Sequence, residues 1–415
     1  MRHRTGTRNQ LALICLTDFL VWLGSGAIYP YLPVFLREDA GASLAMIGLV
    51  AGAYYVAVLA LSVPAGRLSD RVGRKPMLVA GTALYAVSML LFTLTKDPWL
   101  FVLFRAIEGL GAAAVVPAAL AFVAEISSEE HRSRAYGWLT SAQYAGLIIG
   151  PAAAWALLSL GSGGDYGFIG IFLFGSAITA AAAVTLAVYL REPDKTGGSP
   201  PHAMPRPPLR ALLSRPVAAI ILIVATAEFA IGGFEVVWSI YLRDLGASLA
   251  VVGLTWVLFS APLLLSFLGG RLADRHSRFA LMVAGFAVQA VCWLLVPIFH
   301  DPAVFLLIVP VDGLALALAS PATQAFLVQV SPPPWLGTIQ GMEQSGMQLA
   351  ALIGTVAAPL LYAWLGAGFF AIAGIVGLGG LLVGTPMLRR SRLTLRDVSS
   401  AASVSSTDSE SRLDS

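Results

Sequence analysis

Long apolar runs, separated by short segments rich in charge, proline and glycine, dominate the pattern along the chain. A helix needs roughly 20 apolar residues to cross a bilayer, whereas an outer-membrane strand would alternate over about ten. Helices are expected because each satisfies its own backbone hydrogen bonds within lipid. The pattern predicts twelve membrane-spanning helices, at residues 11–36, 44–66, 76–95, 99–124, 136–160, 168–190, 216–242, 249–269, 278–299, 302–328, 338–364 and 367–388.

The composition agrees with a membrane protein and argues against a soluble enzyme. Hydrophobic residues make up 57% of the chain and charged residues only 12%, about half the share of a typical soluble domain. The two cysteines, Cys15 and Cys292, lie inside apolar runs and are expected to be core residues. The histidines show no metal spacing, and no phosphate-binding loop occurs. We therefore expect no metal, no cofactor and no nucleic-acid partner.

The positions of Lys and Arg predict the orientation, because cytoplasmic loops carry an excess of these residues. With the N-terminus inside, 22 of the 26 fall in the predicted inside segments. Both termini are thus expected in the cytoplasm, and the protein in the cell (inner or plasma) membrane. The first apolar run is too long for the core of a signal peptide and is interpreted as the first span.

The spans and the segments between them predict five regions. Residues 191–214 are rich in proline, glycine and charge, which is typical of a linker, and residues 391–415 are rich in Ser and Asp, which is typical of a disordered end. The predicted regions are an N-terminal arm at 1–10, a six-helix bundle at 11–190, a cytoplasmic linker at 191–214, a second six-helix bundle at 215–388 and a disordered tail at 389–415.

The two bundles are copies of one unit. Residues 66–81 match residues 270–285 at nine of sixteen positions, a shift of 204. The same shift relates Glu108-Gly109 to Asp312-Gly313, and composition bias does not place polar residues in one register. Six helices per copy predict an all-α membrane protein of two pseudo-symmetric bundles, with a substrate site between them near the midplane.

The loop between the second and third spans, GRLSDRVGRKP, resembles the signature loop of the major facilitator superfamily. The resemblance covers about residues 10–390 and implies the twelve-helix fold of that family. In the family this loop is thought to latch the cytoplasmic side of the outward-facing state. Gly66 is expected to allow close helix approach and Gly73 a tight turn. The implied latch residues are Gly66, Asp70, Arg71, Gly73 and Arg74, with Asp274 and Arg275 in the second copy. The alternative is a basic loop that serves topology only.

Two further motifs point within the family to its drug:proton antiporters. Gly146, Gly150 and Pro151 form G-x-x-x-G-P, which resembles the antiporter motif of drug exporters, although Ala154 and Trp155 stand where that motif has further glycines. A role in helix packing alone is the alternative. Arg105, Glu108 and Gly109 resemble the motif around a buried arginine in proton-coupled members.

Ionisable residues within spans are costly and are functional candidates by default. Seven occur, and six of them fall on spans 1, 4, 7 and 10, which line the cavity in the family that the chain resembles. These six are Asp18, Arg105, Glu108, Glu228, Glu235 and Asp312. For the seventh, Glu343 in span 11, a packing or gating role and a direct role in transport are equally favoured.

A carboxyl group in a dry site favours its neutral form and can exchange a proton near physiological pH. Asp18, Glu228 and Asp312 have no basic residue within a helical turn and are predicted proton carriers. Glu108 lies three residues after Arg105 on one helix face, which predicts an ion pair. A proton on Glu108 would free Arg105, so Glu108 is also a predicted proton carrier; a permanent structural pair is the alternative.

Five carboxyls against one arginine on these four spans disfavour an anionic substrate and favour a lipophilic cation or a neutral amphiphile. Aromatic rings on the same spans would attract such a compound, although each ring alone is as well explained by contact with lipid. Glu235, near the outer end of its span, is predicted either to be simply water-exposed or to line the cavity. The predicted cavity residues are Arg105, Trp22, Tyr29, Glu235 and Trp238.

Three functions remain open from the sequence. The first is a proton-coupled exporter of small lipophilic compounds that works by alternating access. The second is a proton-coupled importer of a neutral nutrient, and the third is a membrane sensor that kept the fold without transport. For the exporter we expect a monomer in lipid, with a small-molecule substrate, protons as partners and the proton gradient as the energy source.

Overall fold

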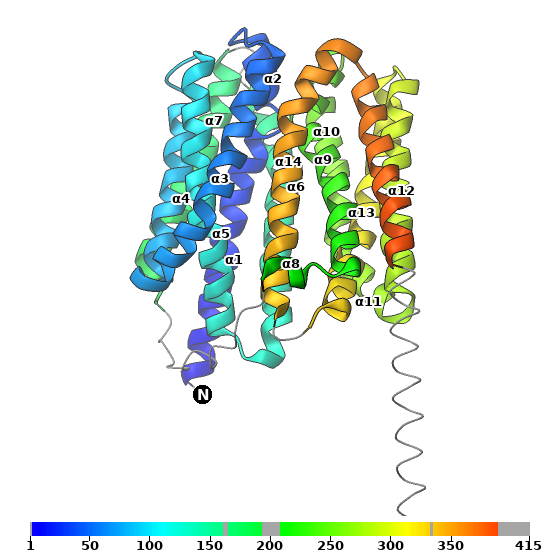
Figure 1. Ribbon diagram of the computed structural model, residues 1–415. Helices are drawn as coiled ribbons and strands as arrows, with labels where there is room; N and C mark the ends of the chain where they lie inside the picture. The colour runs from blue at the N-terminus through cyan, green and yellow to red at the C-terminus, as the bar shows by residue number, and fades with distance from the viewer. Residues whose placement is uncertain (1, 161–164, 193–207, 333–334, 389–415) are drawn as a thin grey trace, which may run out of the picture.

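The computed structural model describes residues 2–160, 165–192, 208–332 and 335–388, and the regular structure within these ranges is helical (Figure 1). Ten helices there are long and apolar enough to cross a membrane. Two more segments complete the predicted set: α4 (Arg74–Leu91) and α10 (Leu249–Ser260), which continues through η1 (Ala261–Leu265) and α11 (Ser266–Arg275). The prediction of a twelve-helix membrane protein is thereby confirmed. Most of the predicted linker and all of the predicted tail lie outside the described residues.

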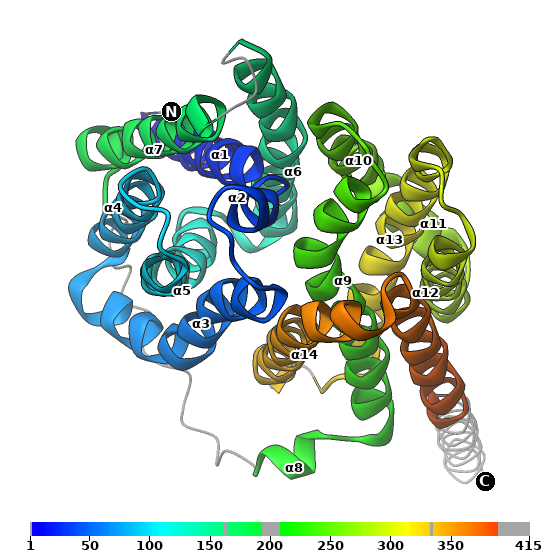
Figure 2. The same cartoon turned by 90° about the horizontal axis from the view of Figure 1, so that it is seen from above.

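The helices form two groups that stand side by side, with α3 and α6 of the first group facing α14 and α10 of the second (Figure 2). The first group contains α1 (Arg2–Ile28), α2 (Leu32–Glu38), α3 (Leu44–Val72), α4, α5 (Pro98–Ile126), α6 (Glu129–Leu160) and α7 (Asp165–Tyr189). The second contains α8 (Leu209–Leu212), α9 (Arg215–Asp244), α10, η1 (Ala261–Leu265), α11 (Ser266–Arg275), α12 (Arg278–Leu295), η2 (Val296–Ile298), α13 (Pro302–Val330), α14 (Leu336–Leu365) and a final helix (Gly368–Leu388).

Equivalent helices of the two groups begin in the same way. The Asp97 carboxylate accepts a hydrogen bond from the Trp99 amide at 3.0 Å, and the Asp301 carboxylate accepts one from the Ala303 amide at 2.9 Å. A proline follows each capping aspartate, where its missing N–H costs nothing. The first helix, α1, begins at Arg2 and so includes most of the predicted N-terminal arm.

Glycines bring equivalent helix pairs into backbone contact. A side-chain carbon at Gly109 of α5 would lie 2.4 Å from the carbonyl oxygen of Tyr54 in α3. At Gly313 of α13 it would lie 2.1 Å from the carbonyl oxygen of Phe259 in α10. Only glycine permits these approaches, so the repeat seen in the sequence is also a repeat of helix packing.

The two ends of the molecule differ in how the halves meet. We call the end where α7 finishes and α9 begins the linker end, and the opposite one the distal end. At the distal end two ion pairs join the halves: Arg37 Nη1 lies 3.0 Å from Asp244 Oδ2, and Arg243 Nε lies 2.7 Å from Glu38 Oε1. The Tyr362 hydroxyl donates to Asp244 at 2.7 Å. These five residues form what we call the distal clasp.

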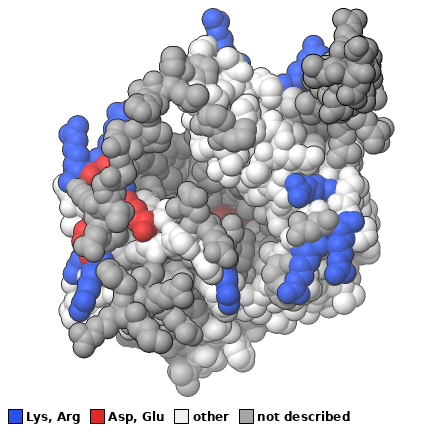
Figure 3. All heavy atoms as spheres, turned by 90° about the horizontal axis from the view of Figure 1, so that it is seen from below, with Lys and Arg blue, Asp and Glu red and all other residues white. Residues whose placement is uncertain are grey.

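The linker end is open. Seen from that end, the surface is hollowed between the two halves, and an acidic side chain is visible inside the hollow (Figure 3). Basic side chains surround the opening. The contacts at the distal end and the hollow at the linker end together describe a molecule whose interior is accessible from one side.

Candidate functional site

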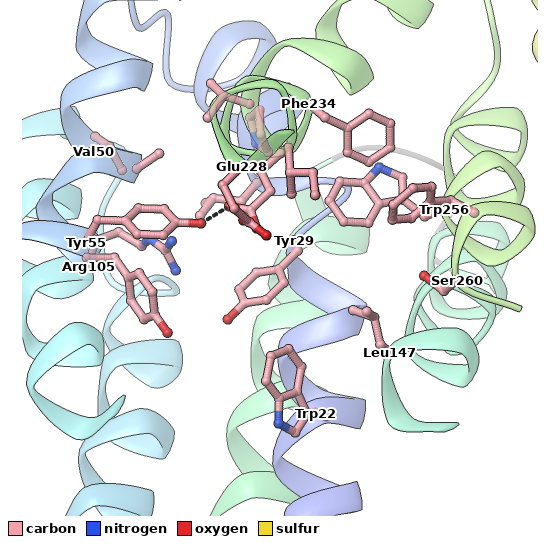
Figure 4. A pocket seen from close by; sticks show the side chains of 18 of the residues that line it. Trp22, Tyr29, Val50, Tyr55, Arg105, Leu147, Glu228, Phe234, Trp256 and Ser260 are labelled. Atoms are coloured by element: carbon pink, nitrogen blue, oxygen red, sulfur yellow. Dashed lines mark hydrogen bonds between the residues drawn. The ribbon is translucent and has the colours of Figure 1, made fainter. Parts of the chain in front are cut away.

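A cavity of about 400 Å³ lies between the halves, within the size range of small-molecule sites. Helices α1, α3, α5 and α6 of the first half and α9 and α10 of the second contribute side chains to it. Most of the lining is aromatic or aliphatic, with a few polar groups converging on the centre (Figure 4). The predicted cavity residues Trp22, Tyr29, Arg105 and Glu235 all line it.

Arg105 and Glu108 form a buried ion pair on α5, with 2.8 Å between Nη1 and Oε2. The predicted pair is thus confirmed in this conformation. The guanidinium carbon also lies 4.7 Å from the ring centre of Tyr54 and 5.7 Å from that of Tyr29. Two aromatic faces and one carboxylate therefore stabilise a cation that would otherwise be costly to bury.

Two acids of α9 point into the same cavity. Glu235 accepts a hydrogen bond from the Tyr55 hydroxyl at 2.6 Å, so the prediction of a simply water-exposed carboxylate is wrong. Glu228 lies between Tyr55 and Tyr29 (Figure 4). Tyr55 comes from α3 of the first half, so this hydrogen bond joins Glu235 of the second half to the first half at the cavity.

Asp18 and Asp312 lie within their own halves and are not among the residues that line the cavity. Asp18, 8% exposed, sits on α1 beside the amide of Gln143 from α6. Asp312, 6% exposed, sits on α13 beside the amide of Gln289 from α12. Among the residues that the structure describes, one carboxylate oxygen of each aspartate has no hydrogen-bond partner. Each site therefore has an acceptor left over that a proton would satisfy.

The prediction that Trp238 lines the cavity is wrong. Its side chain is 1% exposed, and its indole N–H donates to the Thr255 hydroxyl at 3.0 Å. It stacks on Phe234 with 5.3 Å between ring centres and contacts Phe305 edge-on. Trp238 lies one turn beyond Glu235 on the same helix, but its large ring is buried in an aromatic core instead of facing the cavity.

The predicted latch loop has an internal network at the linker end. Arg74 donates to Asp70 at 2.6 Å and to Glu125 of α5 at 2.8 Å, while Arg71 is exposed. Gly73 has a φ of 105°, so the predicted tight turn is present, and the Glu192 carboxylate accepts from the amides of the two residues that follow it. In this open conformation Asp70 is 66% exposed at its side chain.

One expectation about the latch is not met in this conformation, and the latch in the second copy stays a prediction. The close helix approach expected at Gly66 is wrong for this conformation, because no described atom of another helix lies within 4 Å of a side-chain carbon placed there. In the second copy Arg275 is exposed, and the side chain of Asp274 lies outside the described residues. Arg278, the counterpart of Arg74, donates to the Ala325 carbonyl at 3.3 Å.

The antiporter-like motif is a packing surface between α6 and α1. A side-chain carbon at Gly146 would lie 2.6 Å from the carbonyl oxygen of Phe19, and one at Gly150 would lie 2.6 Å from the amide nitrogen of Ala27. The carbonyl of Pro151 accepts from the Tyr31 hydroxyl at 3.3 Å. This geometry favours the packing interpretation, and it places the motif directly behind the cavity wall.

Several site residues were missed from the sequence. Tyr54 and Tyr55 face the cavity from α3, and their signal was an adjacent pair of aromatic polar residues in an otherwise apolar helix. Gln289 was detectable as a lone amide within its span. The distal clasp had a signal too, because Arg-Glu at 37–38 and Arg-Asp at 243–244 occupy corresponding ends of the two copies.

Known proteins resemble the chain in sequence. Multidrug resistance protein 2 of Bacillus subtilis is 34% identical over 198 residues, which is 46% of each chain. Multidrug resistance protein 1 of the same species is 28% identical over 235 residues, or 56% of this chain and 59% of that one. Quinolone resistance protein NorA of Staphylococcus aureus is 25% identical over 57% of this chain and 59% of its own. The chain thus spans about half the length of the curated relatives it matches.

Solved structures share the fold over nearly the whole chain. A bacterial homolog of the human lysosomal transporter Spinster, in an inward-facing and unoccupied conformation, aligns with a TM-score of 0.70, 17% identity and 93% of both chains. The nucleoside transporter NupG aligns with a TM-score of 0.72 and 14% identity over 91% of this chain and 99% of its own. The family model for the Major Facilitator Superfamily matches residues 14–241 and 220–406. This multi-pass membrane protein therefore belongs to the Major Facilitator Superfamily, whose members are transporters and not enzymes.

Proposed function

We propose that the protein is a proton-driven exporter of small lipophilic cations and neutral amphiphiles, which works by alternating access between its two halves. The observation that carries this proposal is the chemistry of the cavity. Aromatic and aliphatic side chains dominate its lining, and Glu228 and Glu235 supply negative charge. Its cation, Arg105, is already paired with Glu108. The multidrug and quinolone resistance names of the relatives support export of such compounds.

The proposal includes an orientation and an energy source. The linker end faces the cytoplasm, as the distribution of Lys and Arg favours, so the open conformation would accept substrate from inside the cell. Asp18, Glu228 and Asp312 exchange protons, and no other cofactor is required. The loop around Asp70 and Arg74 latches the linker end when the distal clasp opens. The protein works as a monomer in the cell membrane.

Efflux measurements in a bacterial host that lacks its own drug pumps test this proposal. Cells that express the protein are loaded with cationic dyes, and efflux is followed with and without a protonophore. We expect energised cells to lose dye faster than cells with an empty vector, and the protonophore to abolish the difference. Glu228→Gln and Asp18→Asn are expected to reduce efflux, while Glu343→Gln, a buried acid outside the cavity lining, serves as the control. Equal efflux by expressing and empty cells across the panel would refute the exporter.

A further inference from the structure

We infer that the cavity selects amphiphiles that carry two cationic groups about 10 Å apart, and that Glu228 and Glu235 each bind one of them. This inference rests on the proposed function and adds to it a charge number and a spacing. It follows from the positions of the two residues along α9, from the charge balance of the cavity and from the rings around them.

The spacing comes from helix geometry. Glu228 and Glu235 are seven residues apart on α9, which is two turns, so their side chains leave the same helix face. A rise of about 1.5 Å per residue separates the two positions by about 10 Å along the helix axis. Both residues line the cavity, with Glu228 nearer the linker end, where α9 begins. Two negative groups thus follow one another along the path from the opening inward.

With Glu228 and Glu235 both ionised, the side chains that line the cavity carry a net charge of two negative units. Among the lining residues that the structure describes, Arg105 is the one basic side chain, and Glu108 neutralises it at 2.8 Å. No described ion pair within 4 Å involves Glu228 or Glu235. The Tyr55 hydroxyl orients Glu235 without neutralising it. Burying an unpaired charge is costly, so two protons, a cation with a proton, or one dication must balance the pair.

Neighbouring groups distinguish these three states. The charged or titratable groups that face Glu235 come from both halves: Tyr29, Tyr54, Tyr55, Arg105 and Glu228. Those that face Glu228 are Glu235 itself, Glu343 of α14, Tyr144 of α6 and Tyr55 of α3. Glu343 accepts two hydrogen bonds from Gln324, at 3.0 and 3.1 Å, and does not line the cavity. A monocation therefore leaves one α9 acid that must keep its proton, whereas a dication lets both protons leave.

The rings around the acids suit the apolar part of such a ligand. Trp22 of α1 and Tyr29 of the turn that follows it lie on one side, and Phe234 and Trp256 lie on another (Figure 4). Aromatic faces attract ammonium groups and pack against alkyl chains. A ligand with a cationic group at each end and an apolar spacer would match this arrangement along its whole length.

Binding to the purified protein in lipid nanodiscs tests the inference. The probes are bis(trimethylammonium)alkanes with nitrogen–nitrogen distances from about 5 Å to about 15 Å, which bracket the helix spacing. Alkyltrimethylammonium ions of equal chain length are the matched monocations, and affinity is read from quenching of tryptophan fluorescence. We expect the dications to bind at least about tenfold more tightly than their matched monocations, with a maximum near 10 Å. Titration calorimetry in buffers of different ionisation enthalpy should show one more proton released by the dication.

Three variants sharpen the test. Glu228→Gln and Glu235→Gln should each reduce the advantage of the dication to about onefold and remove the extra proton, while Glu343→Gln should preserve both. An affinity that is indifferent to spacer length, or an advantage that survives in both α9 variants, would overturn the inference. If monocations bind and are exported, and the dications show no preference for spacer length, the exporter stands and only the dication inference fails. If neither class binds, both fail.

Discussion

Glu108 and Asp312 occupy the same position in the two halves, 204 residues apart, and yet their surroundings differ. Glu108 is 1% exposed and pairs with Arg105, whose guanidinium reaches the cavity. Asp312 is 6% exposed and lies beside the neutral amide of Gln289, and Val309 stands where the first half has Arg105. Each acid is followed by a glycine that brings its helix against a neighbour.

The comparison separates what the two halves share from what they do not. Helix packing is repeated, because the glycines after both acids meet a backbone carbonyl of the neighbouring helix. Charge is not repeated. In the first half a fixed cation accompanies the acid, whereas no described ion pair involves the acid of the second half, so a proton could bind there without breaking one. This asymmetry suits a transporter in which one half holds a charge in place and the other changes charge during the cycle.

The largest expected effect comes from breaking the ion pair of the first half. Arg105→Met leaves Glu108 buried without its cation, which should destabilise the protein by about 3–5 kcal/mol. Thermal unfolding of the purified protein in detergent measures the change. The double variant Arg105→Met/Glu108→Met removes both charges and should recover most of the lost stability. A single variant as stable as the wild type would mean that Glu108 takes up a proton in place of its pair.

The second prediction concerns the acid of the second half. Asp312→Asn preserves shape and breaks no ion pair, so the unfolding temperature should change little, whereas protonophore-sensitive efflux should fall on the order of 100-fold. The two variants should therefore differ: Arg105→Met should lose stability, whereas Asp312→Asn should lose proton coupling. Loss of folding in Asp312→Asn with efflux retained per folded molecule would contradict the assignment.

Much of the architecture could be predicted because it depends on features that persist along the chain. Apolar runs predicted the membrane-spanning helices, and Asp, Pro and Gly residues that recur 204 positions apart revealed the repeat. The Arg105–Glu108 pair was predictable because it lies within one helical turn. Gly73 was predictable for the same reason, since a turn is a local structure.

Features that depend on helix rotation or on distant contacts could not be predicted. Asp312 lies on a helix assigned to the cavity and yet faces α12, because a span that is apolar all round does not encode which side turns inward. Trp238 was misplaced for the same reason. The distal clasp joins residues more than 200 positions apart, so only the assembled halves reveal which arginine meets which acid.

The third prediction tests the repeated packing. Gly109→Ala and Gly313→Ala place a carbon against a backbone carbonyl, so each should lower the stability by about 1–3 kcal/mol. The two losses should be similar, because the packing is repeated in the two halves. Gly170→Ala is the matched control, because no described atom lies within 4 Å of a side-chain carbon there. That control should be neutral or slightly stabilising, since alanine favours a helix. Unequal costs for the two glycines would show that packing, like charge, has diverged between the halves.

The smallest expected effect lies at the distal end, where the halves contribute in a reciprocal way. Each half supplies one arginine and one acid, and the paired side chains are between 31% and 39% exposed, so each pair should contribute no more than about 1 kcal/mol. Arg37→Ala and Arg243→Ala should therefore each shift the balance of open and closed distal ends about two- to fivefold toward open. Distances between spin labels on α2 and α10 measure that balance.

Reversal of one pair distinguishes charge from side-chain packing. In Glu38→Arg/Arg243→Glu the ion pair is restored with the opposite polarity, so the distal end should close as in the wild type, whereas Glu38→Arg alone should open it. Arg243 also donates to the Ala247 carbonyl at 2.8 Å, so its loss should open the distal end slightly more than the loss of Arg37. If both single variants and the reversal leave the distances unchanged, apolar contacts and not the clasp keep this end closed, and the asymmetry between the halves is confined to the membrane interior.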